Sequence, residues 1–309
     1  MDSRDTRDLM VTIRCLVYNH EPYLRQCLDG FVMQKTNFRF EAIVHDDAST
    51  DGSADIIREY AAKYPDIIKP IIQTENQYSK RDGSITRILN AYTHGKYVAY
   101  CEGDDYWTDP LKLQKQVDFL ESHPDYVMCS HRFKVFKQNE NLMEDDWYGE
   151  VPDGITYDLN SLIHGSWYNQ PLTLVYRFEA LNVNEYLKYP NAKDATLVYH
   201  LLKNGKGYLM PDVMGVYRLH SGGVWAGASI GSRICGEFKT RAGICEVEQS
   251  YESAFFLREL FNGWIPRSWM LREWRLMVKS FRMISSYFGR VSTIKMYVLK
   301  ILLNKNLKE

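Results

Sequence analysis

The stretches FRFEAIVHDD (residues 38–47) and KYVAYCEGDD (residues 96–105) each join an apolar run to a cluster of carboxylates. Carboxylates crowded at the end of a strand repel one another and lose solvation, so a fold keeps them mainly where a cation or a hydrogen-bonding ligand compensates. In open α/β sheets the ligand crevice lies outside the carboxyl ends of the strands. The two clusters therefore predict a metal and nucleotide site at one edge of such a sheet.

Strand-like and helix-like segments alternate through the first half of the chain. Runs rich in β-forming residues predict strands at 10–17, 38–44, 67–72 and 97–101, and apolar residues at helical spacing predict helices at 23–33, 53–64 and 84–93. Alternation of this kind favours a largely parallel sheet covered by helices on both faces, so the fold class that we expect is α/β.

The second half of the chain is less regular. We expect a helix at 110–120, strands at 126–136 and 172–177, a helix at 194–204, a returning strand at 207–217 and helices from about 237 onward. The stretch 137–159 is polar, acidic and rich in turn residues, so it predicts a loop over the site or a boundary between two halves.

The composition is that of an ordinary globular protein. The chain has 309 residues, of which 45% are hydrophobic, and a formal net charge of -1, and nothing in it indicates a nucleic-acid binder. Its six cysteines form no C-x-x-C pair, so we expect reduced, packed thiols. MDSRDTRDLM lacks the apolar core of a secretion signal, and no uninterrupted apolar stretch is long enough to span a bilayer. We therefore expect a cytoplasmic protein.

The C-terminal segment is basic. From Arg258 to Glu309 the chain carries eleven Lys or Arg against three Glu. These helices are compatible with peripheral contact with the inner face of the cell membrane, with packing on the rest of the chain, and with a second subunit in a homodimer. The apolar stripe that would make such a contact consists of Ile294, Tyr297, Val298, Ile301 and Leu302.

The second acidic cluster carries the sharper chemical signal. Gly103, between Glu102 and Asp104, leaves room for a phosphate and metal group to approach the backbone. Carboxylate oxygens suit Mg2+ or Mn2+, which complete their coordination shells with substrate phosphates and water. An exposed acidic turn is the alternative, but the preceding strand is more apolar than a solvated loop requires. In the first cluster, Asp46 and Asp47 could bind a ligand or help to cap the next helix.

Five segments in consistent order carry a family resemblance: LVYNHEPYLRQCLDG, VHDDASTDGS, TENQ, GKYVAYCEGDDYWTDPLKLQKQVDFL and GVYRLHSGGVW. Over roughly residues 10–225 the chain resembles the family 2 glycosyltransferases, which have the GT-A fold. It resembles in particular the non-processive bacterial type that carries an EGDDYW motif, because the Q-x-x-R-W motif of processive synthases is missing. The resemblance implies a nucleotide-binding, doubly wound mixed sheet, mostly parallel and flanked by helices.

The resemblance also implies a domain organisation. Residues 1–232 would form the catalytic domain, with a nucleotide-sugar-binding half at 1–108 and an acceptor-side half at 109–232. A helical extension would follow at 233–309.

Roles for individual residues follow from the same resemblance. Asp194 occupies the position of the family's catalytic base, although from the sequence alone it reads more readily as a helix cap. Asp104 and His220 would bind the metal ion with Asp105 beside them, and Trp225 could pack over the donor as a lid. The residues implied in nucleotide binding are Tyr18, Asn19, Glu21, Asp46, Asp47, Asn76, Glu102, Gly103 and Arg218.

The function implied is that of an inverting glycosyltransferase assisted by Mn2+ or Mg2+. It would move one sugar per encounter from a nucleotide-sugar, commonly a UDP-sugar, to a hydroxyl of a glycan or lipid-linked acceptor in surface polysaccharide synthesis. Two alternatives stay open. One is a sugar-nucleotide nucleotidyltransferase, although LVYNHEPY is no Gly-rich triphosphate loop, and the other is a non-catalytic nucleotide-sugar or glycan-binding module.

Overall fold

The computed structural model describes residues 8–190, 192–223, 228–260, 274–289 and 293. Contacts within the chain divide it into two compact units. The first unit consists of Met1–Tyr157, Tyr168–Val183 and Leu201–Ser221, and the second of Asp158–Trp167, Asn184–His200 and Gly222–Glu309. The expected domain boundary between residues 232 and 233 stays a prediction.

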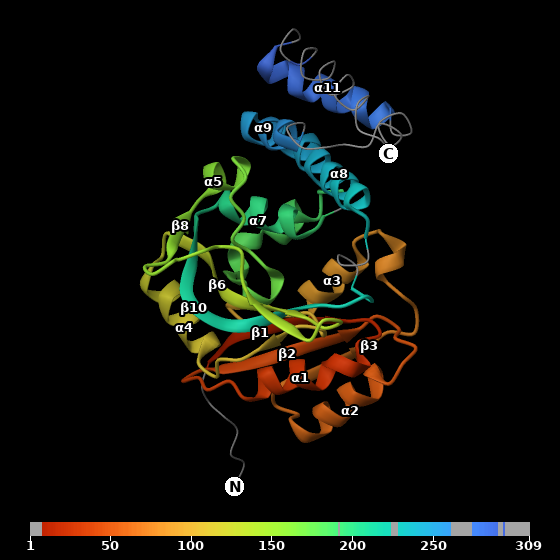
Figure 1. Cartoon of the computed structure of the whole chain (residues 1–309), viewed down its shortest axis with the longest axis vertical. Helices are drawn as coiled ribbons and strands as arrows, with labels where there is room; N and C mark the ends of the chain where they lie inside the picture. Colours follow the sequence, from red (N-terminus) through yellow and green to blue (C-terminus); the bar gives the residue numbers. More distant parts are fainter. Residues whose placement is uncertain (1–7, 191, 224–227, 261–273, 290–292, 294–309) are drawn as a thin grey trace. The chain divides into compact units, whose positions relative to one another are not determined.

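In the described residues, the first unit is built on a mixed sheet of ten strands (Figure 1). Their spatial order is β3-β2-β1-β4-β9-β6-β10-β5, and β7 pairs with β6 while β8 pairs with β10. Most paired residues lie in parallel ladders, which join β1 to β2 and β4, β2 to β3, and β6 to β10. The expected α/β class is confirmed. The strands are β1 (Leu9–Val17), β2 (Arg39–Asp46), β3 (Ile68–Ile72), β4 (Tyr97–Tyr100), β5 (Tyr106–Trp107), β6 (Tyr126–Lys137), β7 (Leu142–Asp145), β8 (Ile155–Tyr157), β9 (Val175–Arg177) and β10 (Lys206–Leu219).

Helices cover this sheet. Figure 1 shows α1 (Glu21–Val32) and α2 (Ser53–Lys63) side by side next to the strands β1 to β3, and α4 (Lys112–Ser122) contacts β6. The remaining helical segments of the first unit are α3 (Ser84–Ala91) and the 3-10 turns η1 (Tyr78–Lys80), η2 (Pro171–Thr173) and η3 (Phe178–Leu181).

The second unit is helical in the part that the structure describes. Its helices α8, α9 and α11 pack around a core that includes Phe238, Ala242, Leu257 and Ile284. Its elements are α5 (Leu159–Ile163), all but the first residue of α6 (Val183–Tyr186), all but the last two residues of α7 (Asp194–Leu202), α8 (Ile230–Glu248), α9 (Tyr251–Glu259) and α11 (Trp274–Phe288).

The strand β1 shows why this sheet sits in the middle of the first unit. Val11, Ile13 and Cys15 on one face are fully buried in the main hydrophobic core. On the opposite face the guanidinium of Arg14 is also buried, and it donates to Thr93 Oγ1 and Asn90 Oδ1, so its polar groups are paired inside the protein. Burial on both faces is expected of a central strand in a parallel sheet.

All six cysteines are buried and free, which confirms the expectation of packed, reduced thiols. Three of them, Cys15, Cys27 and Cys101, gather beneath the turn that follows β4. Cys15 Sγ lies 4.0 Å from Cys27 Sγ, and Cys27 Sγ lies 3.4 Å from the backbone oxygen of Glu102. Burial raises the pKa of the Cys27 and Cys101 thiols above the ordinary value, so both are held as neutral thiols.

The prediction of a loop at 137–159 holds for residues 138–141 and 146–154, but the short strands β7 and β8 interrupt it. A boundary between the two compact units also falls in this stretch, between Tyr157 and Asp158. The strand β7 returns antiparallel along the end of β6 after a turn in which Asn141 has a φ of 49°. All four residues of β7 are exposed and show no alternation of apolar and polar side chains, so no periodic signal marks the strand. Its existence depends on hydrogen bonds to β6, which local sequence does not reveal.

Two further expectations on the second half of the chain need correction. The predicted strand at 172–177 begins instead with the 3-10 turn η2, and β9 is confined to its last three residues. The helix α8 begins at Ile230 and not near 237, because the Ser229 side chain caps it by accepting from the Ser232 N–H. The expected lid residue Trp225 and the apolar stripe from Ile294 to Leu302 lie outside the described residues.

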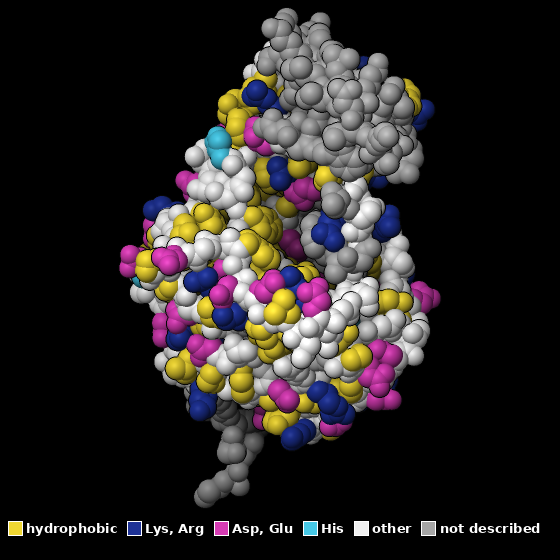
Figure 2. Space-filling view, viewed as in Figure 1, with side chains coloured by type: hydrophobic (Ala, Val, Ile, Leu, Met, Phe, Trp, Pro, Cys, Tyr) yellow, Lys and Arg dark blue, Asp and Glu magenta, His cyan; other side chains and the backbone are white. Residues whose placement is uncertain are grey.

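The surface carries charges of both signs. Over the described part of the face in Figure 2, Lys and Arg side chains lie among Asp and Glu side chains, and no broad area of one sign is present. None of the described helices has the length and apolar character needed to cross a membrane. Contact of the basic C-terminal segment with a membrane or a second subunit stays a prediction.

Candidate active site

The acidic turn Glu102–Asp105 follows β4 at the carboxyl edge of the sheet. The Gly103 N–H donates to the backbone oxygen of Leu16 (3.0 Å), which holds the turn against β1. A side chain at position 103 would not fit, since its Cβ would lie 2.8 Å from His20 Nδ1. One carboxylate oxygen from each of Glu102, Asp104 and Asp105 lies within 4.8 Å of the other two.

Two imidazoles approach one oxygen of the Asp104 carboxylate. Asp104 Oδ2 accepts a hydrogen bond from His220 Nε2 (3.0 Å) and lies 3.8 Å from His20 Nε2. The other oxygen, Oδ1, is buried and has no hydrogen-bond partner among the described residues. Burial raises the pKa of Asp104, but the hydrogen bond from His220 and the electrostatic effect of His20 outweigh it, so the pKa lies below its ordinary value. Asp104 is therefore held as a carboxylate with one unengaged oxygen.

Asp105 and Arg218 join this turn to the end of β10. The Arg218 backbone N–H donates to Asp105 Oδ1 (2.8 Å), and Arg218 Nε donates to the backbone oxygen of Asp104 (2.9 Å). Burial raises the pKa of Asp105 well above its ordinary value, and the charge of Asp104 raises it further. Direct hydrogen bonds thus join the acidic turn to the end of β10, although more than a hundred residues separate them in the sequence.

The donor set at this turn fits a divalent ion. It offers three carboxylates and the His220 imidazole, which suit Mn2+, and the carboxylates alone suit Mg2+. A buried carboxylate oxygen without a hydrogen bond, such as Asp104 Oδ1, is costly unless a cation or a donor comes to it. The residues present therefore agree with the metal that the sequence predicts.

The second cluster lies at the end of β2. Asp46 is buried; its Oδ2 accepts from the Ser49 N–H (3.1 Å), whereas its Oδ1 has no partner among the described residues. The Asp47 carboxylate accepts from the backbone N–H groups of Gln77 (2.7 Å) and Tyr78 (3.0 Å), which fixes the turn η1. A carboxylate has about four lone-pair sites, so Asp47 keeps acceptor capacity after these two bonds.

Asn19 and Glu21 connect the loop after β1 to the loop after β2. Asn19 Oδ1 accepts from the Thr50 N–H (2.8 Å), and Glu21 Oε2 accepts from the Gly52 N–H (2.8 Å). Asn19 adopts a φ of 56°, a left-handed conformation that asparagine tolerates better than most residues. The two side chains predicted to touch the nucleotide therefore fix the two loops that would form its pocket.

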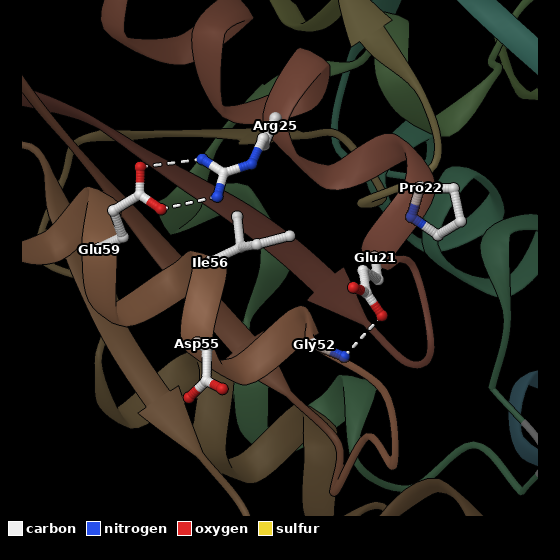
Figure 3. A pocket seen from close by; sticks show the side chains of 7 residues that line it. All are labelled: Glu21, Pro22, Arg25, Gly52, Asp55, Ile56 and Glu59. Carbon is white, nitrogen blue, oxygen red and sulfur yellow. Dashed lines mark hydrogen bonds and ion pairs between the residues drawn. The ribbon is translucent and has the colours of Figure 1, made fainter.

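A surface cavity of about 560 Å³ lies beside these loops, between α1 and α2 (Figure 3). Arg25 donates to both carboxylate oxygens of Glu59 across it (2.9 and 2.7 Å), and Glu21 accepts from Gly52 at one end. Neither Asp47 nor Asp104 lines this cavity, so we do not place the donor there. Its lining residues are Glu21, Pro22, Arg25, Gly52, Asp55, Ile56 and Glu59.

The other predicted site residues lie as follows. Tyr18, at the end of β1, is 48% exposed, and Asn76 Nδ2 donates to the Asp47 backbone oxygen (3.2 Å). Asp194 is exposed and is the first residue of α7, in the second unit, whereas both acidic clusters belong to the first unit.

Sequence reasoning missed His20. Burial lowers the pKa of His20, while the charges of Asp104, Asp51 and Asp46 raise it to a smaller extent, so both acidic clusters act on this ring. Its Nδ1 is buried without a hydrogen-bond partner among the described residues. The signal was available, because His20 stands in the segment LVYNHEPY beside two predicted site residues.

The mixed sheet with an acidic turn at its carboxyl edge is the architecture of GT-A glycosyltransferases. The sequence model of Glycosyl transferase family 2 matches residues 15–183, more than half of the chain. The chain therefore belongs to family 2 of the glycosyltransferases.

The chain is also similar to individual relatives and to solved structures. The chain is 36% identical over 224 residues to an uncharacterized protein of Mycobacterium tuberculosis, a match that covers 71% of this chain and 61% of that relative's length. It is 27% identical over 220 residues to TuaG of Bacillus subtilis, a putative teichuronic acid biosynthesis glycosyltransferase, covering 68% of this chain and 79% of that one. The crystal structure of S. aureus TarS 1–349 superposes with a TM-score of 0.63 at 16% identity, covering 97% of this chain and 92% of TarS, which shows a shared fold.

Proposed function

We propose that the chain is an inverting, non-processive glycosyltransferase that moves one sugar from a UDP-sugar to a hydroxyl of a glycan or lipid-linked acceptor in surface polysaccharide synthesis. The observation that carries the proposal is the acidic turn at the carboxyl edge of the sheet, where Asp104 Oδ2 accepts a hydrogen bond from His220 and Asp104 Oδ1 is buried with no partner in the described part of the chain. The relative TuaG is named for teichuronic acid biosynthesis, and TarS has been crystallised with UDP and with UDP-GlcNAc. The likeness to TuaG supports a surface polymer as the product, and the likeness to TarS supports a UDP-sugar as the donor.

In this proposal Asp104 and His220 hold Mn2+ or Mg2+, with Asp105 and Glu102 beside them. A divalent ion bound there neutralises the negative charge that grows on the departing nucleoside diphosphate. Because Asp104 is ionised and is oriented by its bond to His220, the chain presents a fixed carboxylate before any ligand arrives.

The nucleoside is proposed to bind at the end of β2. Asp46 Oδ1 and the remaining acceptor sites of Asp47 can receive the imide N–H of uracil or a ribose hydroxyl. Tyr18 is exposed next to them and offers an aromatic face for the base. Asn19 and Glu21 fix the loops around this pocket, and Asn76 holds the Asp47 backbone.

Asp194 is proposed as the general base. An acceptor hydroxyl is a poor nucleophile, and a carboxylate within hydrogen-bond reach can remove its proton as the hydroxyl oxygen attacks the anomeric carbon. A single displacement of this kind inverts the anomeric configuration. We expect Asp194→Asn to abolish sugar transfer and to leave the affinity for UDP and Mn2+ unchanged, because the amide keeps the shape of the side chain and loses its basicity.

The experiment measures UDP release with a panel of UDP-sugars and acceptors, and UDP affinity by calorimetry with Mn2+ or with EDTA. Glu185→Gln in α6 is the matched control, since it removes an exposed carboxylate of the second unit that bonds Lys188. Transfer at the normal rate by the Asp194 variant would refute the assignment of the base. Saturable binding of a UDP-sugar with no release of UDP under any condition would favour the binding module instead.

A further inference from the structure

Arg218 has an environment unlike that of a cation that waits for a phosphate. It is only 6% exposed. Its guanidinium carbon lies 4.9 Å from the ring centre of Tyr23, 5.3 Å from that of Tyr106 and 5.4 Å from that of Phe136. Three aromatic rings from α1, β5 and β6 thus surround the cation, an arrangement that fixes a guanidinium by cation–π attraction.

The hydrogen bonds of this side chain are directed to the protein. A guanidinium has five N–H donors. Arg218 uses one on the Asp104 backbone oxygen (2.9 Å), one on Gln26 Oε1 (2.6 Å) and one on Gln138 Oε1 (2.6 Å). Gln26 belongs to α1 and Gln138 follows β6, so the side chain joins α1, the β6 end and the acidic turn.

The backbone of Arg218 acts on the same turn, since its N–H donates to Asp105 Oδ1. Main chain and side chain of one residue therefore hold both aspartates that follow Gly103. Neither bond engages Asp104 Oδ1, the buried oxygen for which the described residues provide no partner.

We infer that Arg218 is a positioning residue that sets the geometry of the metal-binding carboxylates, and that it is not a ligand of the diphosphate. The inference rests on the proposed metal site at Asp104, and it gives Arg218 a role other than the nucleotide contact that the resemblance implies. The two glutamines and the three aromatic rings hold Arg218 in place, and Arg218 holds the acidic turn Glu102–Asp105 in place.

Two affinities separate this role from the alternatives: that for a metal ion without nucleotide and that for UDP without metal. If Arg218 acted only through its charge, its removal would strengthen the binding of a cation nearby, because two positive charges repel. If it bound phosphate, its removal would weaken UDP binding in the absence of metal. Loss of positioning alone weakens the binding of a metal in the absence of nucleotide, typically by about 10- to 100-fold for residues that orient ligands.

The test is the affinity of the nucleotide-free protein for Mn2+, measured from the free-ion signal in electron paramagnetic resonance, for wild type and Arg218→Gln. We expect the variant to bind Mn2+ at least about tenfold more weakly. We expect its affinity for UDP in EDTA, measured by calorimetry, to stay within about twofold of wild type, because the inference gives Arg218 no phosphate contact; a tenfold change corresponds to 1.4 kcal/mol.

Two further variants test the inference even if Arg218→Gln does not fold. Gln26→Leu and Gln138→Leu each remove one acceptor of the guanidinium, at an exposed and a half-buried position, and each should weaken Mn2+ binding by a smaller factor. Arg132→Gln is the control: it removes a cation on β6 that bonds Asp146, and it should lower stability without changing Mn2+ affinity.

Unchanged or tighter Mn2+ binding by folded Arg218→Gln would overturn the inference, and so would loss of metal-free UDP binding. If wild type itself bound no Mn2+, the proposed metal site would fail first, which is a different result.

Discussion

Replacing Lys112 by methionine should make the stability of the protein less dependent on pH. Lys112 is the first residue of α4 and is fully buried. Its ammonium donates to Gln116 Oε1 (2.7 Å) and lies 4.0 Å from the centre of the Trp107 ring. Neither partner is a carboxylate, so within the residues that the structure describes the cation is buried without an ion-pair partner.

The expected change in the free energy of unfolding follows from the pKa of Lys112. Burial lowers the pKa of Lys112 from 10.5 to about 7. Between these two values the unfolded chain binds a proton that the folded chain does not, so the free energy of unfolding rises with pH in that window. From pH 7 to pH 9 the rise amounts to about 2 kcal/mol, because each unit of pKa difference corresponds to about 1.4 kcal/mol and the group is half protonated at pH 7. Lys112→Met has no such proton and should lack this rise.

Urea denaturation followed by circular dichroism at pH 7, 8 and 9 measures the effect. The stability of Lys112→Met relative to wild type should fall by about 2 kcal/mol across this range. Lys115→Met, three residues further along α4, is the control: its ammonium bonds Asp109 (2.8 Å) and Asp212 (2.6 Å), which raise its pKa, so it is charged in both states throughout. A difference between wild type and Lys112→Met that stays constant from pH 7 to pH 9 would refute the reasoning.

Three further substitutions should change the free energy of unfolding. Gly95→Ala should lower the free energy of unfolding by about 2 kcal/mol, because the new Cβ would lie 2.5 Å from the Thr12 amide nitrogen, a backbone atom that is held in place. Gly236→Ala inside α8 would make only ordinary contacts and should raise the free energy of unfolding by about 1 kcal/mol. Thermal melts of the two variants and the wild type measure both changes. Asp146→Asn should lower the free energy of unfolding by about 2 kcal/mol, since it removes the charge that accepts two hydrogen bonds from Arg132. Urea melts in low and high salt should give nearly the same loss, because the Asp146 carboxylate is buried and therefore shielded from ions, although Arg132 is only half-buried.

The alternating first half of the chain was predictable because each segment satisfies its own periodicity. The strands β1 and β2 and the helices α1 and α2 all lie within a few residues of the expected ranges. The position of the acidic clusters followed as well, since a carboxylate after a buried strand must come out at the carboxyl edge of a parallel sheet.

What could not be predicted depends on contacts between distant segments. The exposed strand β7 exists through its pairing with β6, and the two-residue strand β5 through its pairing with β10. The partners of the site carboxylates were hidden for the same reason: Asp47 is engaged by a turn some thirty residues away, and the cation Arg218 is enclosed by three rings from separate elements. The resemblance implied nucleotide binding for Arg218, whereas the positioning role that we infer for it depends on these surroundings.

The burial of every native thiol has a practical consequence for spectroscopy. Maleimide reagents attack thiolates, and burial keeps the pKa of Cys27, Cys101, Cys129 and Cys245 above the ordinary value. One cysteine introduced at an exposed position such as Tyr78 would therefore react far ahead of the six native ones. A fluorophore or spin label could be attached there on the natural background, without first deleting any of the sulfur atoms that fill the interior.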